Sequence, residues 1–184
     1  SDSWCAYSSP VTVDADGDGT REVFASASFG TVGAFTLDWK PLWSVPSFYQ
    51  TNPLSHEVSV ADFDGDSRLE AIVLEHSGDF VAYDVKTGKE QWRHPFEKTK
   101  ITDQAAADID GDGLPEALFC RSNALMALSG KREPVDGRLL WTLPLSAEGG
   151  PPIIADVDGD GLLEVVVCTA DGFVNVIGAL DRSD

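Results

Sequence analysis

The chain has 184 residues, of which 42% are hydrophobic, enough for one domain or a fragment of a larger one with its own core. Asp and Glu total 31 against 13 Lys and Arg, so the formal net charge is −18. This balance excludes a nucleic-acid-binding protein, which needs a basic surface. The hydrophobic fraction argues against disorder, and no apolar run reaches the roughly 20 residues of a membrane span. Because no signal-peptide pattern opens the chain, we expect that any such segment has been removed or that the chain was excised from a longer protein.

Short apolar segments recur in the same order along the chain, and none shows a helical period. In the first repeat, we predict strands at Pro10–Val13, Val23–Ser26, Gly33–Leu37 and Leu42–Trp43. The second repeat has them at Glu57–Ala61, Ala71–Leu74, Phe80–Asp84 and Gln91–Trp92. The third has them at Gln104–Ala107, Ala117–Cys120, Ala124–Leu128 and Leu140–Trp141. The fourth has them at Pro152–Ala155, Val165–Cys168 and Phe173–Ile177.

An acidic loop separates the first and second strands of every repeat, with Asp at its first, third and fifth positions and Glu at its ninth. The loops cover residues 14–22, 62–70, 108–116 and 156–164 and hold 16 of the 31 acidic residues. Their closing Glu residues are 48, 46 and 48 residues apart. A period of this length indicates a solenoid or a propeller, and four short strands per repeat favour a β-propeller blade.

The sequence therefore predicts an all-β fold, a single β-propeller domain over residues 1–184. Its four four-stranded blades span approximately 8–50, 51–98, 99–146 and 147–184, the last together with 1–7. The fourth repeat lacks a Trp strand, whereas Ser3–Tyr7 precedes the first loop and carries Trp4. We expect this N-terminal strand to close the last blade beside its third strand. The alternative is a four-blade part of a larger or oligomeric propeller.

Metal chemistry explains the loops better than an ordinary Asp-Gly turn, because four copies occur in matching context. Carboxylates packed this tightly repel one another, and four divalent cations would reduce the net charge from −18 to about −10. Hard carboxylate oxygens without nearby His or Cys favour Ca²⁺ over Zn²⁺ or copper. Gly at the sixth position allows a sharp bend, and Ser67 replaces it in the second loop. We therefore expect about four Ca²⁺ per chain, with the second site weakest.

These loops resemble those of FG-GAP, or VCBS-type, repeat proteins, the calcium-binding β-propellers of integrin α-subunits and many secreted bacterial proteins. The resemblance covers essentially the whole chain, although that family usually has about seven blades. It implies side-chain ligands at Asp14, Asp16, Asp18, Glu22, Asp62, Asp64, Asp66, Glu70, Asp108, Asp110, Asp112, Glu116, Asp156, Asp158, Asp160 and Glu164. It also implies backbone carbonyl ligands at Thr20, Arg68, Leu114 and Leu162.

The segment Ala82–Trp92 resembles the tryptophan-docking repeat of pyrroloquinoline-quinone dehydrogenases, in which the Trp packs between blades. That motif is structural, and the catalytic residues of quinoproteins are not found in this sequence. We therefore expect no enzyme. A polysaccharide lyase or a quinoprotein-like enzyme is the weaker alternative.

Other chemistry-bearing residues favour structural roles. His56, His76 and His94 share no ligand spacing, and Cys120 and Cys168 lie in apolar strands that predict buried free thiols. With Cys5 the count is three, so a full disulfide framework is excluded. The periodic Trp4, Trp43, Trp92 and Trp141 indicate packing between blades. The aromatic residues outside the period are candidates for an exposed ligand surface: Trp39, Phe48 and Tyr49.

The function expected from these features is that of an extracellular or cell-surface, calcium-stabilised propeller that binds, adheres or assembles. Its partner would be a protein, a glycan or another copy, with strand exchange as a route to a homo-oligomer. The alternatives are a scaffold of a secreted carbohydrate-active enzyme, a lectin, or the structural subunit of a polymer. No catalytic or organic-cofactor site is expected.

Overall fold

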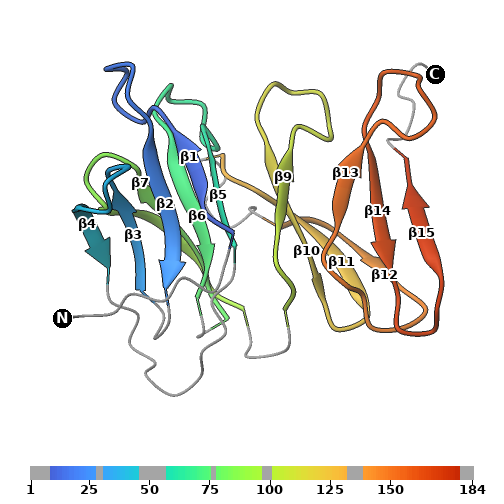
Figure 1. Ribbon diagram of the computed structural model, residues 1–184. Helices are drawn as coiled ribbons and strands as arrows, with labels where there is room; N and C mark the ends of the chain where they lie inside the picture. Colours follow the sequence, from blue (N-terminus) through green and yellow to red (C-terminus); the bar gives the residue numbers. More distant parts are fainter. Residues whose placement is uncertain are drawn as a thin grey trace. The chain divides into compact units, whose positions relative to one another are not determined.

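The computed structural model describes residues 9–27, 31–45, 57–75, 78–96, 101–131 and 139–178. These residues form antiparallel β-sheets, and no helix occurs among them (Figure 1). The all-β class predicted from the sequence is therefore confirmed. In this part of the chain, nothing provides the long apolar helix that crossing a membrane would require.

Each repeat forms one sheet, with its strands paired in chain order. The first sheet contains β1 (Val11–Val13), β2 (Glu22–Ala27), β3 (Thr31–Phe35) and β4 (Pro41–Val45). The second contains β5 (Val58–Ala61), β6 (Glu70–Leu74), β7 (Phe80–Asp84) and β8 (Glu90–His94). The third contains β9 (Ala105–Ala107), β10 (Glu116–Arg121), β11 (Ala124–Ser129) and β12 (Leu139–Pro144). The fourth contains β13 (Ile153–Ala155), β14 (Glu164–Cys168) and β15 (Val174–Ile177).

The pairing register repeats from sheet to sheet. In all four sheets, the residue two positions after the loop Glu pairs with the equivalent residue of the third strand. Examples are Leu118↔Ala127 in the third sheet and Val166↔Val176 in the fourth. In the first three sheets the third and fourth strands shift register after equivalent residues: Ala34, Ala82 and Ala127. Such a bulge adds one residue to one strand and increases the local twist. Sequence similarity between the repeats thus extends to their backbone irregularities.

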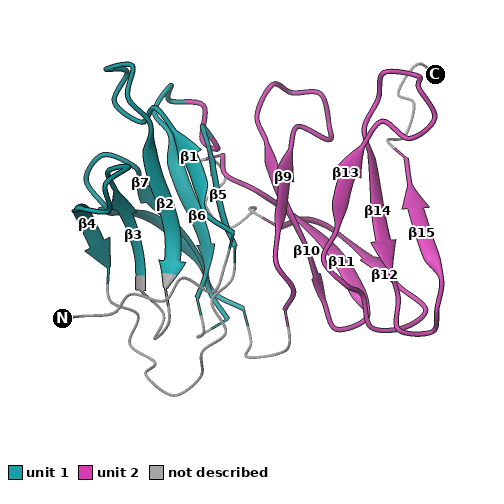
Figure 2. Ribbon diagram, viewed as in Figure 1, with its two compact units in different colours: residues 1–62, 66–98 teal, residues 63–65, 99–184 magenta. Residues whose placement is uncertain are grey.

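The chain divides into two compact units (Figure 2). Residues 1–62 and 66–98 form the first unit, which holds the first and second sheets. Residues 63–65 and 99–184 form the second unit, which holds the third and fourth sheets. Each unit is therefore a pair of successive repeats.

The core of the first unit joins one face of the first sheet to one face of the second. Phe24, Val32 and Ala34 supply the first sheet's side, and Val73 and Val81 belong to the other. All are at most 5% exposed. Because strand side chains alternate between faces, every second residue of each central strand enters this core. The opposite face of the first sheet holds a separate small cluster of its own: Val23, Ala25 and Phe35.

The second unit is built in the same way. Leu118, Leu125 and Ala127 of the third sheet pack with Val165 and Val167 of the fourth. The residues from the third sheet stand at the same register positions as the first-sheet residues in the other core. One packing arrangement between successive repeats therefore occurs twice in the chain.

The other face of the fourth sheet is apolar but exposed. Ile153, Val174 and Val176 are 65%, 63% and 55% exposed, whereas Ala127, the register equivalent of Val176, is fully buried. Cys168 lies on this face and is exposed, so the prediction of a buried thiol is wrong there, although Cys120 is buried as predicted. Both cysteines follow similar apolar runs, but among the described residues only the third sheet of this unit has a neighbour over that face.

Among the described residues, the fourth sheet has three strands, and β15 pairs only with β14. The predicted closing strand at Ser3–Tyr7 lies outside the described residues. Closure of the last blade by that strand therefore stays a prediction.

Candidate metal sites

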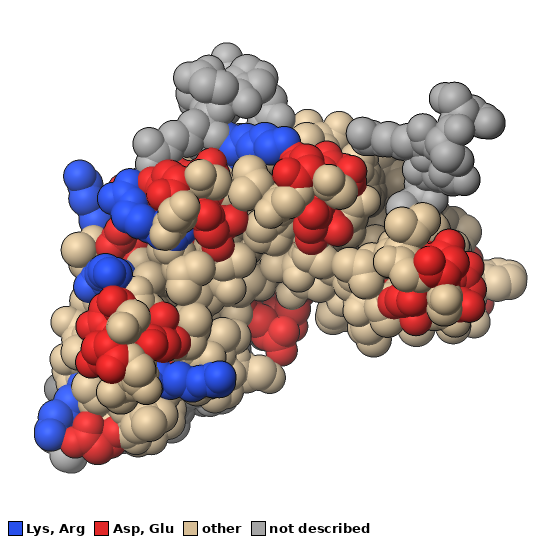
Figure 3. Space-filling view, turned by 90° about the horizontal axis from the view of Figure 1, so that it is seen from above, with Lys and Arg blue, Asp and Glu red and all other residues tan. Residues whose placement is uncertain are grey.

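The four acidic loops join the first and second strands of their sheets. Within each unit, both loops project from the same end of the sheets (Figure 1). Within each unit, the acidic side chains gather in separate patches instead of one continuous surface (Figure 3). Each loop is therefore a local site of its own.

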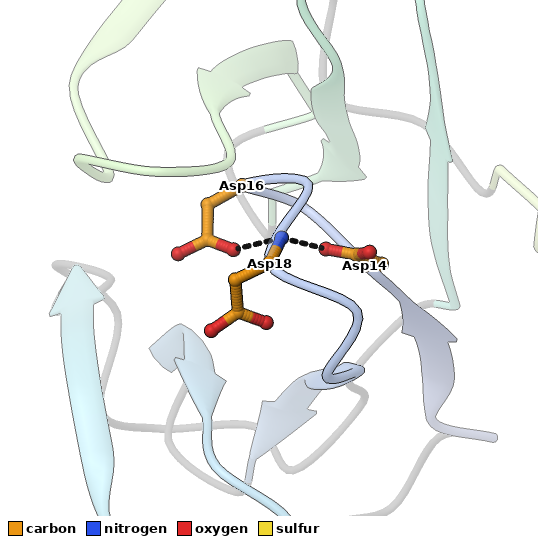
Figure 4. A group of neighbouring side chains, drawn as sticks. All are labelled: Asp14, Asp16 and Asp18. Carbon is orange, nitrogen blue, oxygen red and sulfur yellow. Dashed lines mark hydrogen bonds between the residues drawn. The ribbon is translucent and has the colours of Figure 1, made fainter.

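In the first loop, the backbone wraps around the carboxylate of Asp14. Its Oδ1 accepts hydrogen bonds from the N–H groups of Gly17 (2.7 Å) and Asp18 (3.1 Å), and its Oδ2 accepts one from Gly19 (2.9 Å). Asp16 Oδ1 accepts a second bond from the Asp18 N–H at 3.1 Å (Figure 4). These bonds place Asp14, Asp16 and Asp18 around one point, with a carboxylate oxygen from each within 4.8 Å of the others.

The third and fourth loops repeat this geometry. Asp108 accepts from Gly111 at 2.7 Å and from Gly113 at 2.9 Å, and Asp156 accepts from Gly159 at 2.6 Å. In every loop the N–H of the seventh residue donates to the fifth Asp, over distances of 2.6 to 3.0 Å. Those seventh residues are the predicted carbonyl ligands: Thr20, Arg68, Leu114 and Leu162. Their carbonyl role stays a prediction.

The ninth residue closes the loop from the strand side. In the first, third and fourth loops its Oε2 accepts the backbone N–H of the second loop residue, at 2.8, 3.1 and 2.8 Å. Glu70, Glu116 and Glu164 are all buried. A buried carboxylate needs compensation for lost hydration, and backbone N–H groups supply part of it.

Glu116, the ninth residue of the third loop, lacks part of this compensation. It is fully buried, and its Oε1 has no hydrogen-bond partner. Burial raises the pKa of this carboxyl to about 7, the N–H of Ile109 opposes that shift, and the charges of Asp110 and Asp108 add to it. A carboxylate oxygen of Glu116 lies within 4.8 Å of oxygens from Asp108 and Asp110. The unpartnered oxygen therefore belongs to a cluster of hard oxygen donors, a donor set that fits Ca²⁺.

The structure brings together three of the four predicted acidic ligands in each loop. The groups are Asp14, Asp16 and Asp18; Asp62, Asp64 and Asp66; Asp108, Asp110 and Glu116; and Asp156, Asp158 and Glu164. The remaining acid of each set falls outside the 4.8 Å group: Glu22, Glu70, Asp112 and Asp160. The sequence spacing gave no measure of these distances, and the ligand role of all sixteen acids stays a prediction.

The second loop differs in its backbone. Ser67 has a φ of 65°, where the equivalent glycines of the other loops have 89°, 90° and 89°. Left-handed φ values are strained for residues with a Cβ. The Ser67 N–H still donates to Asp62 Oδ2 at 2.9 Å, so the loop keeps its hydrogen bond at a cost in backbone energy.

Basic side chains contact two of the loops. Arg68 donates through Nε (3.0 Å) and Nη2 to Asp66 Oδ2. Lys131, which follows β11, forms an ion pair with Asp112 Oδ2. The spacing of the acids gave no sign of these contacts, because Lys131 is distant in the sequence and is brought near by the pairing of β10 with β11.

The remaining candidate residues have structural surroundings. Trp43 packs against the core of the first unit and donates its indole N–H to the Val85 carbonyl at 2.7 Å. Trp92 is buried, and Trp141 packs against the core of the second unit. The packing role predicted for Trp43 and Trp141 is confirmed. His94 contacts the ring of Phe96. Trp39 is 56% exposed. Trp4, Cys5, Phe48, Tyr49, His56 and His76 lie outside the described residues.

No known protein-family profile matches the sequence. No curated protein matches it either. Solved structures do. BamB from Moraxella catarrhalis aligns with a TM-score of 0.64 at 15% identity, over 94% of this chain and 43% of its own. BBS1N, solved in complex with ARL6DN, gives 0.70 at 12% identity, over 96% and 48%. The WD40 β-propeller domain of Doa1 gives 0.63 at 11% identity, over 94% and 51%.

These similarities, together with the four repeated antiparallel sheets, define a β-propeller fold. The chain spans about half the length of those solved chains. At such low identity the likeness concerns the fold alone. The predicted propeller is thus confirmed as a fold, whereas membership of the FG-GAP family stays a prediction.

Proposed function

We propose that this chain is a calcium-stabilised β-propeller module of the FG-GAP type, which binds or assembles with macromolecular partners at the cell surface or outside the cell. The ion would be held in each loop by the acids at positions one, three, five and nine. Its chemistry there is electrostatic, since it neutralises carboxylates that otherwise repel one another. The bound ions would stabilise the fold and take no part in catalysis.

The observation that carries this proposal is the unpartnered Oε1 of Glu116. Native proteins leave few buried polar atoms without a partner, and this oxygen is grouped with carboxylate oxygens of Asp108 and Asp110. A hydrogen bond from a side chain could satisfy one oxygen but not three converging carboxylates. A divalent cation satisfies all three and supplies the charge that burial of Glu116 requires.

The kind of binding partner is inferred from the fold and not from the metal sites. BBS1N was solved in complex with ARL6DN, so at least one protein with this fold binds another protein. We extend a protein-binding role to this chain. Its acidic loops bring carboxylates together as metal ligands would be, and they do not place a nucleophile beside a base. The proposal includes an extracellular setting, because sites of moderate affinity, with Kd of roughly 10⁻⁴ to 10⁻³ M, would be filled there.

A calcium titration of thermal stability tests the metal. With calcium tenfold above Kd, each site should add about 1.4 kcal/mol. Four such sites would raise Tm on the order of 10 °C over the protein in chelator. Circular dichroism melts in calcium, in magnesium and in chelator measure the effect. Equal Tm values in calcium and chelator would contradict the proposal.

The variant Glu116→Gln refines this test, because it keeps the shape of the side chain and removes its charge. We expect it to lose one site's share of the calcium effect without lowering Tm in chelator, since no carboxylate charge is then buried. Asp38→Asn is the matched control, because Asp38 is exposed and lies outside the loops. A purely structural role for Glu116 would instead lower Tm in chelator and leave the calcium effect unchanged.

Glycan binding is the second candidate, favoured by one aromatic residue. Trp39 is 56% exposed and its ring lies 5.8 Å from that of Phe35. An exposed aromatic face supported from behind can stack on a sugar ring. Loss of glycan binding in Trp39→Ala, with Tm unchanged, would support the lectin alternative.

A further inference from the structure

The fifth residue of each loop offers two carboxylate oxygens with different surroundings. In all four loops its Oδ1 accepts the N–H of the seventh residue. The Oδ2 takes no part in that bond and can contact an ion. Its surroundings therefore determine how readily the fifth residue can serve as a ligand.

This Oδ2 is capped by a basic side chain in two loops. Arg68 donates to Asp66 Oδ2 through two of its nitrogens, and the Lys131 ammonium pairs with Asp112 Oδ2. In the first and fourth loops, Asp18 and Asp160 form no ion pair with any described residue. Judged on the described residues, the four loops thus fall into an open pair (the first and fourth) and a capped pair (the second and third), although their acidic residues are the same.

The two caps have different origins. Arg68 belongs to the loop itself, whereas Lys131 comes from the far end of β11 and reaches the loop through the fold of the third sheet. The Lys131 side chain is 44% exposed and that of Asp112 is 24% exposed, so water can take over the ammonium when it leaves. A cation that enters the third loop must displace Lys131 from Asp112 or tolerate its charge nearby, and either event weakens binding.

We propose that Lys131 is a built-in competitor for the third metal site, and that Arg68 has the same role at the second. The consequence is two classes of calcium site in one chain: the first and fourth loops fill at lower calcium, and the second and third at higher calcium. This inference rests on the proposed calcium-binding function. It goes further by assigning an order of filling and the residues that set it.

Site-resolved titration tests the order. Gly19, Gly113 and Gly161 occupy the same position in their loops, and the amide signal of each in an NMR titration with calcium chloride reports on its own site. In the unmodified protein, the Gly113 midpoint should lie above those of Gly19 and Gly161. In Lys131→Gln, it should fall about two- to fivefold, the range for a partly exposed ion pair, while the other two midpoints stay constant.

Two control variants separate competition from a change in net charge. Arg93→Gln removes a positive charge at the other end of the second sheet, where it pairs with Glu75 and Asp79, and should move no midpoint. Lys131→Arg keeps a cation near Asp112 and should retain the high Gly113 midpoint. If Gly113 titrates at the same calcium concentration in Lys131→Gln as in the parent, the inference about Lys131 is wrong while calcium binding stands. If no glycine amide responds to calcium, the proposed function itself fails.

Discussion

Ser67 holds a backbone conformation that the first, third and fourth loops give to glycine. Its φ of 65° lies in the left-handed region, which a residue with a Cβ adopts at a cost of about 1 kcal/mol. The sequence showed the departure from the pattern, but two outcomes were open: a changed loop or a strained one. The structure shows the strained one, since the hydrogen bond to Asp62 is kept.

Ser67→Gly should therefore stabilise the protein by about 1 kcal/mol, because the strain is relieved without loss of a described contact. For a chain of this size, that corresponds to a rise of about 2–4 °C in Tm. Thermal melts in chelator measure it without interference from metal. The reverse change in the third loop, Gly113→Ser, should lower Tm by at least as much. A Ser67→Gly variant that is less stable than the parent would contradict the strain argument.

At the scale of elements, equivalent strands differ in what covers them. Cys120 in β10 and Cys168 in β14 are both four residues after the loop Glu, yet the first is buried and the second exposed. Burial raises the pKa of the Cys120 thiol to about 11. At pH 8 this thiol is protonated as well as inaccessible, and only the thiolate reacts with alkylating reagents.

Alkylation with iodoacetamide at pH 8 should thus modify Cys168 and leave Cys120 unreacted. Mass spectrometry of the two peptides reads the sites separately, and labelling in urea, which exposes both, is the control. The folded thiol's raised pKa means that it would gain reactivity only as the pH approaches about 11. Protection of Cys168 in the native protein would show that the open face of the fourth sheet is covered in solution.

Most of the elements could be predicted because their signals are local. Alternating apolar residues and the repeated Asp spacing depend on short stretches, so the strand positions and the acidic loops agree with the structure. The missed features depend on residues distant in sequence. Lys131 reaches Asp112 through strand pairing, and Cys168 is exposed because no described segment packs over its face of the sheet. A sequence pattern shows which strand residues are apolar enough to be buried, but it does not show whether another sheet covers them.

At the scale of the whole molecule, the face of the fourth sheet that carries Val176 continues a packing surface used twice elsewhere. Val176→Lys should change the free energy of unfolding by less than about 0.5 kcal/mol, since an exposed position tolerates charge. Ala127→Lys, at the equivalent buried position, should cost several kcal/mol because it buries an unpaired charge. Urea denaturation gives both values.

Light scattering on the same variants gives the molecular mass. A large loss of stability in Val176→Lys, or a halving of the mass relative to the parent, would mean that the face is covered in solution. The covering surface would then come from the same chain by ring closure or from a second copy. With the mass and the stability both unchanged, the face is open.

One feature of the first repeat bears on the order in which repeats assemble. Trp43 lies against Gly88, where a Cβ would come within 2.6 Å of the indole ring, so only glycine fits. Trp39 has the corresponding place in the first repeat, four residues before its own periodic Trp, and shares the left-handed φ. A side chain there leaves no room for a docked indole. During folding, similar repeats can pair in the wrong order, and a large side chain at this position disfavours docking of another repeat's tryptophan on the first repeat. Trp39 thus distinguishes the first repeat from the second, in which Gly88 leaves room for an indole ring.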